Sequence, residues 1–192
     1  MNRLFLFMTI LVLGVPVYAQ SEKRIDTEEK QENVNSRELK KQLAAIQDSI
    51  NYKNAVSALE KSNFVLEADQ LLFKRGGTAF VSSNTNFVML NGQRATVQVA
   101  FNTPYPGPNG IGGVTVDGTT SDVKVTTDKR GNVNCNFSVQ GIGISAQVFI
   151  TLTNGGNNAT VTINPNFNSN TLTLSGNLVP LNQSDVFKGR SW

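Results

Sequence analysis

The sequence predicts a mainly β domain of antiparallel strands preceded by one α-helix, and three patterns support this fold class. Apolar residues recur at helical spacing over residues 36–62 and alternate with polar residues from residue 63 onward. Turn dipeptides separate the alternating runs. No helical stretch lies between those runs, which excludes parallel crossovers and leaves two architectures open, a β-sandwich and a small closed barrel.

Residues 1–19 predict a cleaved signal peptide. Arg3 provides a positive n-region, an apolar stretch continues to Val15, and Val17, Tyr18 and Ala19 form a cleavage site of small-x-small type. We expect cleavage after Ala19 and export to the periplasm or to the cell exterior. No cysteine near that site is present to take a lipid, and no later stretch is long and apolar enough to span a bilayer. We therefore expect neither a lipid anchor nor a transmembrane segment in the mature chain.

The composition excludes several kinds of chemistry. The 192 residues include 17 lysines and arginines, 14 aspartates and glutamates, and no histidine. A Ser-His-Asp site, a Cys-His site and a histidine-ligated zinc site are therefore impossible. The small, scattered positive charge gives no reason to expect a nucleic-acid partner. Cys135 is the single cysteine and shares the apolar face of a predicted strand with Val133 and Phe137, so we expect a buried, unreactive thiol and no intramolecular disulfide.

Residues 20–62 form the predicted N-terminal region of the mature chain. Residues 20–35 are charged and almost free of apolar side chains, so they bury too little surface to offset the entropy of ordering and we expect a flexible linker. Ser36 is a candidate N-cap for a helix over residues 36–62.

The predicted helix has two apolar faces. The first, which we call the interaction stripe, consists of Leu39, Leu43, Ile46 and Ile50. The nearly opposite face carries Tyr52, Ala55, Val56 and Leu59. A kink or break near Asn51 is the commoner explanation for such a change of side. The alternative is a continuous helix whose second half packs on the β-domain while the interaction stripe is offered to a partner.

Residues 63–192 predict about eight to ten strands. The alternation is clearest over residues 95–101, 133–139 and 142–152, and it is typical of antiparallel strands with one buried and one solvated face. The turn signals that separate the runs are Asn91-Gly92, Asp117-Gly118, residues 128–131, residues 154–156 and Ser175-Gly176.

Four short motifs resemble a known family. They are Asn86-Phe87-Val88, residues 107–113 (GPNGIGG), residues 128–131 (DKRG) and Phe187-Lys188-Gly189. Together they resemble the domain-of-unknown-function 4251 family, over most of the chain from the helix to the C-terminus. The resemblance implies an exported protein of a Gram-negative anaerobe, built as a lipocalin-like β-barrel with an N-terminal helix. No activity is assigned to that family, so the resemblance implies no catalytic residues.

Few residues of the β-domain suggest a reaction. Glu67 and Asp69 lie two apart on a predicted strand and so share a face, as an acid–base pair would, although two solvated carboxylates are the commoner explanation. Residues 107–113 lack the lysine and the following helix of a phosphate-binding loop, and we interpret them as a turn-rich connection. Asp117 and Asp128 adjoin glycines of predicted turns, where aspartate is favoured for its local hydrogen bonds. We therefore assign no catalytic, cofactor-binding or metal-binding residue.

The sequence leaves three classes of function. The first is a non-enzymatic barrel of the bacterial envelope that binds a small apolar ligand, a glycan or a protein. The second is a structural or interaction protein that acts through the interaction stripe. The third, which has the least support, is a carboxylate-dependent hydrolase that uses Glu67 and Asp69. An interior cavity would favour the first class, and a filled barrel with self-association would favour the second.

Overall fold

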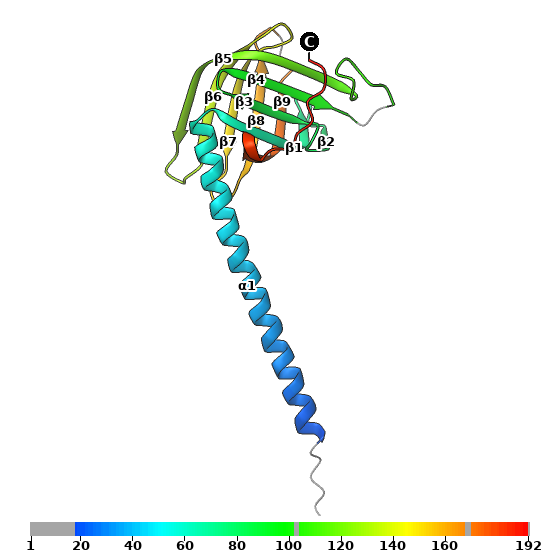
Figure 1. Ribbon diagram of the computed structural model, residues 1–192, viewed down its shortest axis with the longest axis vertical. Helices are drawn as coiled ribbons and strands as arrows, with labels where there is room; N and C mark the ends of the chain where they lie inside the picture. The colour runs from blue at the N-terminus through cyan, green and yellow to red at the C-terminus, as the bar shows by residue number, and fades with distance from the viewer. Residues whose placement is uncertain (1–17, 102–103, 168–169, 192) are drawn as a thin grey trace, which may run out of the picture. The chain divides into compact units, whose positions relative to one another are not determined.

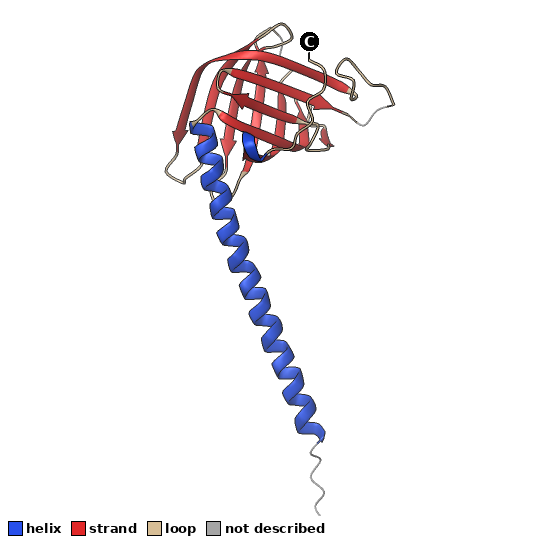
Figure 2. Ribbon diagram, viewed as in Figure 1, coloured by secondary structure: helices blue, strands red, loops and turns tan. Residues whose placement is uncertain are grey.

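The computed structural model describes residues 18–101, 104–167 and 170–191, with side chains from residue 34 onward (Figure 1). Over these residues one long helix precedes nine strands and a short 3-10 turn (Figure 2). The elements are α1 (Tyr18–Glu60), β1 (Asn63–Phe73), β2 (Thr78–Phe80), β3 (Phe87–Asn91), β4 (Arg94–Ala100), β5 (Gly113–Thr127), β6 (Val133–Gln140), β7 (Ser145–Leu152), β8 (Asn158–Pro165), β9 (Leu172–Pro180) and η1 (Leu181–Gln183). The expected number of strands is confirmed.

Eight of the strands close into an antiparallel barrel. The sheet runs in the order β2-β1-β3-β4-β5-β6-β7-β8-β9, and β9 also pairs with β1 from Phe64↔Pro180 to Phe73↔Leu172. β2 lies outside this closed ring, because it pairs only with the second half of β1. The barrel is therefore correct and the β-sandwich is wrong.

The alternation of side chains in β6 and β7 confirms the predicted register. Val148 and Ile150 are buried in the barrel interior, whereas Phe149 between them is exposed on the outer surface. Cys135 pairs with Ile150 across the two strands and is only 1 % exposed. A shift of one residue would move all of these side chains to the opposite face, so burial of the apolar row fixes the register.

Two of the predicted turns are strand interiors instead. Asp117-Gly118 lies in the middle of β5, and Ser175-Gly176 lies in β9. A side chain at Gly118 would stand 2.7 Å from the Val139 side chain, and one at Gly176 would overlap the Glu67 carbonyl oxygen. Glycine is therefore needed at these positions for close approach of neighbouring strands in a coiled sheet, and not for a chain reversal.

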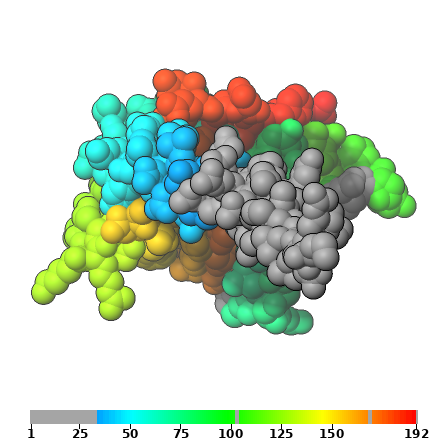
Figure 3. All heavy atoms as spheres, turned by 90° about the horizontal axis from the view of Figure 1, so that it is seen from below, coloured from blue at the N-terminus to red at the C-terminus, as the bar shows by residue number. Residues whose placement is uncertain are grey.

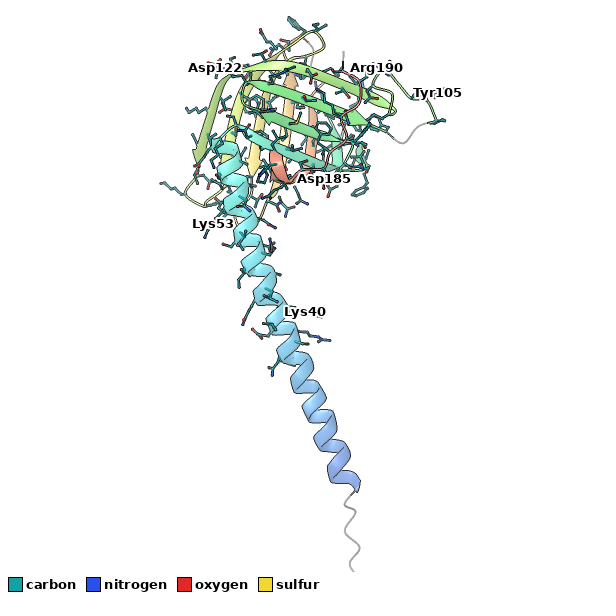
Figure 4. The ribbon with its side chains drawn as sticks, viewed as in Figure 1. Lys40, Lys53, Tyr105, Asp122, Asp185 and Arg190 are labelled. Atoms are coloured by element: carbon teal, nitrogen blue, oxygen red, sulfur yellow. The ribbon has the colours of Figure 1, made fainter. Side chains whose placement is uncertain are left out.

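Both faces of β4 are buried, which corrects the expectation of one solvated face. Val97 faces the barrel interior, while Thr96, Gln98 and Ala100 on the outer face are also buried. The C-terminal residues 184–191, which we call the strap, hydrogen-bond to this outer face and its surroundings. Asp185 and Arg190 mark the strap in Figure 4. The strap therefore replaces water over β4.

Helix α1 starts earlier than predicted and has no break. It begins at Tyr18, whereas the sequence predicts a start at Ser36 after a flexible linker. Glutamate, lysine, glutamine and arginine dominate residues 21–35, and these are good helix formers even without an apolar face. The helix is also continuous through Asn51, so the expected kink is absent. The chain divides into two compact units at Ala44–Ala45.

Within the second unit, the last turns of α1 close one end of the barrel. Ala55 and Leu59 are buried in the same apolar cluster as the strand side chains, as predicted for this face of the helix, and Ala58 is buried there too. Tyr52 is half-buried, and its hydroxyl donates a hydrogen bond to the Gly131 carbonyl oxygen in the β5–β6 turn. Figure 3 shows these turns of α1 in cyan, next to the yellow-green β5–β6 turn and the gold β7–β8 turn. We call this the closed end.

Among the described residues, no helix is both long enough and apolar enough to cross a membrane.

Candidate functional site

The opposite end of the barrel contains an apolar cavity of about 570 Å³. Its wall and rim are built from strand ends and turns that are far apart in the sequence: Phe73, Val97, Val99, Phe101, Val114, Val116, residues 141–146, Ile163, Pro165, Phe167, Asn170 and Leu172. Cavities of roughly 300–1,000 Å³ with mainly apolar walls are typical of small-molecule sites. This cavity is therefore the candidate functional site.

Cross-strand pairs build its wall. Val97 of β4 faces Val116 of β5, and Val99 faces Val114 one step nearer the opening. On the other side, Ile163 of β8 faces Leu172 of β9. Since paired residues point to the same face of a sheet, the antiparallel register places these β-branched and aliphatic side chains together in the lumen.

The opening of the cavity, which we call the mouth, is surrounded by five exposed apolar side chains: Phe73, Phe101, Val114, Ile142 and Phe167. The Phe73 and Phe101 rings stack with centroids 6.3 Å apart. Ile142 is 96 % exposed and Phe167 is 89 % exposed. The alternation predicted Ile142 to be part of the buried row, but β6 ends at Gln140, and Ile142 lies in the β6–β7 turn.

Polar groups are few in this site. Ser145 and Asn170 are the hydrogen-bonding side chains among the lining residues, and the Ser145 hydroxyl accepts a hydrogen bond of 2.9 Å from Asn166. None of the lining residues that the structure describes is charged. The site is therefore suited to hold an uncharged apolar molecule, and its lining residues provide no general acid or base.

The carboxylates singled out in the sequence do not form a pair. Glu67 is half-buried and accepts a 2.6 Å hydrogen bond from the Ser184 hydroxyl of the strap. Asp69 lies where the pairing of β1 with β9 shifts register, so the two side chains no longer follow simple alternation. Over the described residues no group of three His, Cys, Asp or Glu side chains is arranged to hold a metal ion.

Residues 107–113 form the expected turn-rich connection. The Asn109 side-chain oxygen accepts hydrogen bonds from the backbone nitrogens of Ile111 and Gly113, and Gly112 donates to the Pro106 carbonyl oxygen. These backbone donors are engaged within the loop, so they are not available for an anion.

The strap fixes this loop through a buried polar network. Gln98 donates to the Phe187 carbonyl oxygen at 2.7 Å and accepts from the Gly189 nitrogen at 2.8 Å. The Thr115 hydroxyl donates to Gln98 at 2.7 Å and accepts from Asn109 at 3.3 Å. The Asn86 side chain accepts from the Ala100 nitrogen at 2.8 Å. Three of the four motifs that resemble the family thus lie together in the fold. Their hydrogen-bonded polar groups fix the loop and the strap on the outer face of β4 and β5.

Asp117 belongs to the same region and not to a turn. Burial opposes its ionisation, but hydrogen bonds from Lys188, Thr96 and Ser191 outweigh that effect and lower the pKa of Asp117 below its ordinary value of 3.8.

Asp128, in contrast, has the hydrogen bonds that the sequence predicts for an aspartate in a turn. Its carboxylate accepts hydrogen bonds from the Asn132 side chain and backbone and from the Arg130 backbone, which lowers its pKa.

Two further predicted features are found where the sequence places them. Burial raises the pKa of the Cys135 thiol from 9.0 to about 11, which suits an unreactive side chain. The interaction stripe (Leu39, Leu43, Ile46 and Ile50) is exposed, between 46 % and 57 %. Sequence reasoning missed Phe73, Phe101 and Val114 at the mouth. One feature of the sequence could have pointed to the mouth. Residues 141–143 place an isoleucine between two turn glycines, where a polar residue is usual.

The fold and the site define a small antiparallel barrel with one end closed by a helix and an apolar cavity open at the other. The chain belongs to the DUF4251 family, a family of unknown function whose model matches residues 46–178. It is similar to a DUF4251 family protein from Bacteroides eggerthii, known from a crystal structure, with 72 % sequence identity and a TM-score of 0.64. The match covers 77 % of this chain and 99 % of that one. No curated protein matches the chain.

Proposed function

We propose that the protein is a non-enzymatic binding module of the bacterial envelope that holds a small, uncharged apolar molecule in the barrel. The observation that carries the proposal is the cavity of about 570 Å³ with valine, isoleucine, leucine and phenylalanine walls. Interiors of eight-stranded barrels are just large enough to hold one small ligand. Export of the mature chain after Ala19 is part of this proposal, and N-terminal sequencing of protein recovered from the periplasm or medium tests it.

The chemistry of the lining selects among the candidate ligands. A glycan needs several side-chain amides or carboxylates for its hydroxyl groups, and among the described lining residues Ser145 and Asn170 are the two with polar side chains. The carboxylate of a fatty acid drawn into the cavity would have no charged partner among the described lining residues. A neutral hydrocarbon-rich molecule with at most one or two polar atoms matches the site best.

Uptake of the neutral fluorophore N-phenyl-1-naphthylamine tests this function. We expect saturable binding with one probe per chain. Val99→Trp, at a half-buried position that lines the cavity, should fill it and weaken binding at least about tenfold. Val123→Trp is the matched control, since Val123 is an exposed residue of β5 that does not line the cavity. Absence of saturable uptake, or equal binding by both variants, would contradict the proposal.

A second candidate function is association through α1. Its support is the interaction stripe, because four exposed aliphatic side chains at helical spacing resemble one seam of a coiled coil. The two functions are compatible, since they use different elements. The hydrolase has no comparable support, because Glu67 and Asp69 do not converge with each other in a cleft.

A further inference from the structure

We propose that the mouth docks onto the surface of an anionic lipid bilayer, from which an apolar molecule enters the cavity. The proposal rests on the proposed function, because it names the source of the ligand for the same site. Three features carry it: exposed apolar side chains around an open cavity, two cations beside them, and the absence of acidic residues from the described connecting segments at this end.

The apolar part of the docking surface is Phe73, Phe101, Ile142 and Phe167. These side chains come from β1, the residue that follows β4, the β6–β7 turn and the β8–β9 connection, and they all line one opening. Ile142 and Phe167 are almost fully exposed, so neither contributes to the core. Aromatic and aliphatic side chains at loop tips partition favourably into the boundary between lipid head groups and acyl chains.

The cationic part is Lys74 and Arg75, which directly follow Phe73. Both are exposed in the β1–β2 turn, where Gly76 with φ 84° reverses the chain. The one ion pair found among the described residues is Lys188–Asp117, so Lys74 and Arg75 are not neutralised within that part of the chain. The described connecting segments of this end, residues 73–78, 104–112, 141–145, 166–167 and 170–171, contain no aspartate or glutamate. Asp117 of β5 shares a surface pocket with Ile142, but it is paired with Lys188. The net charge of +2 on the connecting segments is complementary to anionic head groups.

A bilayer explains why the apolar side chains surround a cavity instead of forming a flat patch. Seated on a membrane, the mouth would place its apolar wall in continuity with the acyl region. An uncharged apolar molecule would then pass from lipid to barrel without crossing water, which is the costly step for such a molecule.

The closed end provides a matched control. Lys129-Arg130-Gly131 in the β5–β6 turn repeats the Lys74-Arg75-Gly76 tripeptide, and the two glycines have the same φ of 84°. Lys129 and Arg130 are exposed, but Asp128 lies beside them and α1 covers that end. Reversing the charges of Lys129 and Arg130 therefore changes the net charge of the protein as much as reversing those of Lys74 and Arg75, but it leaves the mouth unchanged.

Flotation with vesicles of phosphatidylethanolamine and phosphatidylglycerol, compared with vesicles of phosphatidylcholine, tests the docking. We expect binding to the anionic vesicles that weakens with added salt. Lys74→Glu/Arg75→Glu should weaken this binding at least about tenfold. Ile142→Ser/Phe167→Ser should also weaken binding to the anionic vesicles, because the apolar side chains that enter the bilayer are lost. Lys129→Glu/Arg130→Glu should remain within about twofold of wild type. Cooperative melting of every variant checks that it folds.

The outcomes separate docking from ligand binding. If the wild type takes up N-phenyl-1-naphthylamine but does not float with anionic vesicles, the docking proposal is overturned and the proposed function stands. If it floats but takes up no probe, the proposed function fails and docking stands. Equal losses in the Lys74/Arg75 and Lys129/Arg130 variants would also overturn docking, because net charge alone would then explain the binding. Retrieval of a protein partner by the mouth in place of vesicles would overturn it as well.

Discussion

The Lys188 ammonium lies 2.8 Å from the Asp117 carboxylate and joins the strap to the middle of β5. Thr96, the cross-strand neighbour of Asp117, donates a second hydrogen bond to that carboxylate at 2.6 Å. Strap, β4 and β5 are thus linked through one charged group. We therefore expect attachment of the strap to weaken in acid.

We predict that Asp117→Asn lowers stability at neutral pH by about 1 kcal/mol, since both charged side chains are partly solvated and solvent screens their attraction. The pKa of Asp117 is lower in the folded protein than its ordinary value of 3.8, so ionised Asp117 stabilises the fold above that value. This stabilisation is lost as the pH falls through the lowered pKa. Urea unfolding across acidic pH should therefore show the difference between wild type and variant shrinking. A difference that does not change with pH would contradict the prediction.

We predict that Cys135 reacts slowly with thiol reagents under native conditions. Burial raises its pKa to about 11, so almost none of it is thiolate at neutral pH, and the side chain is inaccessible. The measurement is the rate of labelling by a chromogenic disulfide, before and after denaturation. Asn136→Cys in a Cys135→Ala background is the control, because Asn136 is exposed on the same strand and should react at once. Equal rates at both positions would show that the register of β6 is wrong.

We predict that Val148→Asp or Ile150→Asp prevents folding. Both side chains are buried in the barrel, and burial of an unpaired charge costs more than the roughly 5–15 kcal/mol that stabilises a domain. Phe149→Asp, between them but exposed on the outer face, should retain native circular dichroism and a cooperative thermal transition. The opposite pattern would place the core on the other face of β7.

We predict that Leu59→Ala lowers the free energy of unfolding by about 2–5 kcal/mol, the usual cost of deleting a fully buried leucine side chain. Val34→Ala, a substitution of an exposed aliphatic residue of the same helix, should change it by less than about 0.5 kcal/mol. Urea denaturation measures both. A small effect at Leu59 would mean that α1 does not contribute to the barrel core.

We predict that replacing Leu39, Leu43, Ile46 and Ile50 together by glutamine leaves the melting temperature nearly unchanged, because all four side chains are exposed. If the interaction stripe is a seam between two copies of the chain, the substitution should abolish self-association in sedimentation equilibrium. A monomeric wild type, or an unfolded quadruple variant, would remove the support for the second candidate function.

Period-two alternation predicted antiparallel strands with one buried face, and it placed Cys135, Val148 and Ile150 in the core correctly. It left the choice between sandwich and barrel open. It failed where tertiary packing decides the environment. Gln98 and Thr96 read as solvated residues, because the strap that covers them lies about 90 positions away in the sequence. Gly118 and Gly176 read as turns, because a glycine required by close strand approach has the same local sequence as one required by a chain reversal.

The candidate site was less predictable than the fold for a related reason. Its residues come from separate segments, and each has an ordinary local explanation: Phe73 and Phe101 as strand residues, Phe167 as a loop aromatic. Only barrel closure brings them around one opening. The interaction stripe was visible in the sequence because all of its residues belong to one helix.

The separation of the two ends has a consequence for how such a barrel diversifies. Turns that contact α1 carry residues on which the core depends, such as Gly131 with its hydrogen bond from Tyr52. The β6–β7 turn and the β8–β9 connection instead contribute Ile142 and Phe167, which are solvent-facing and support no core packing. Sequence changes in those two connections would alter what the barrel admits at little thermodynamic cost. Under the proposed function, selection for stability and selection for the ligand would therefore act on different parts of the same small chain.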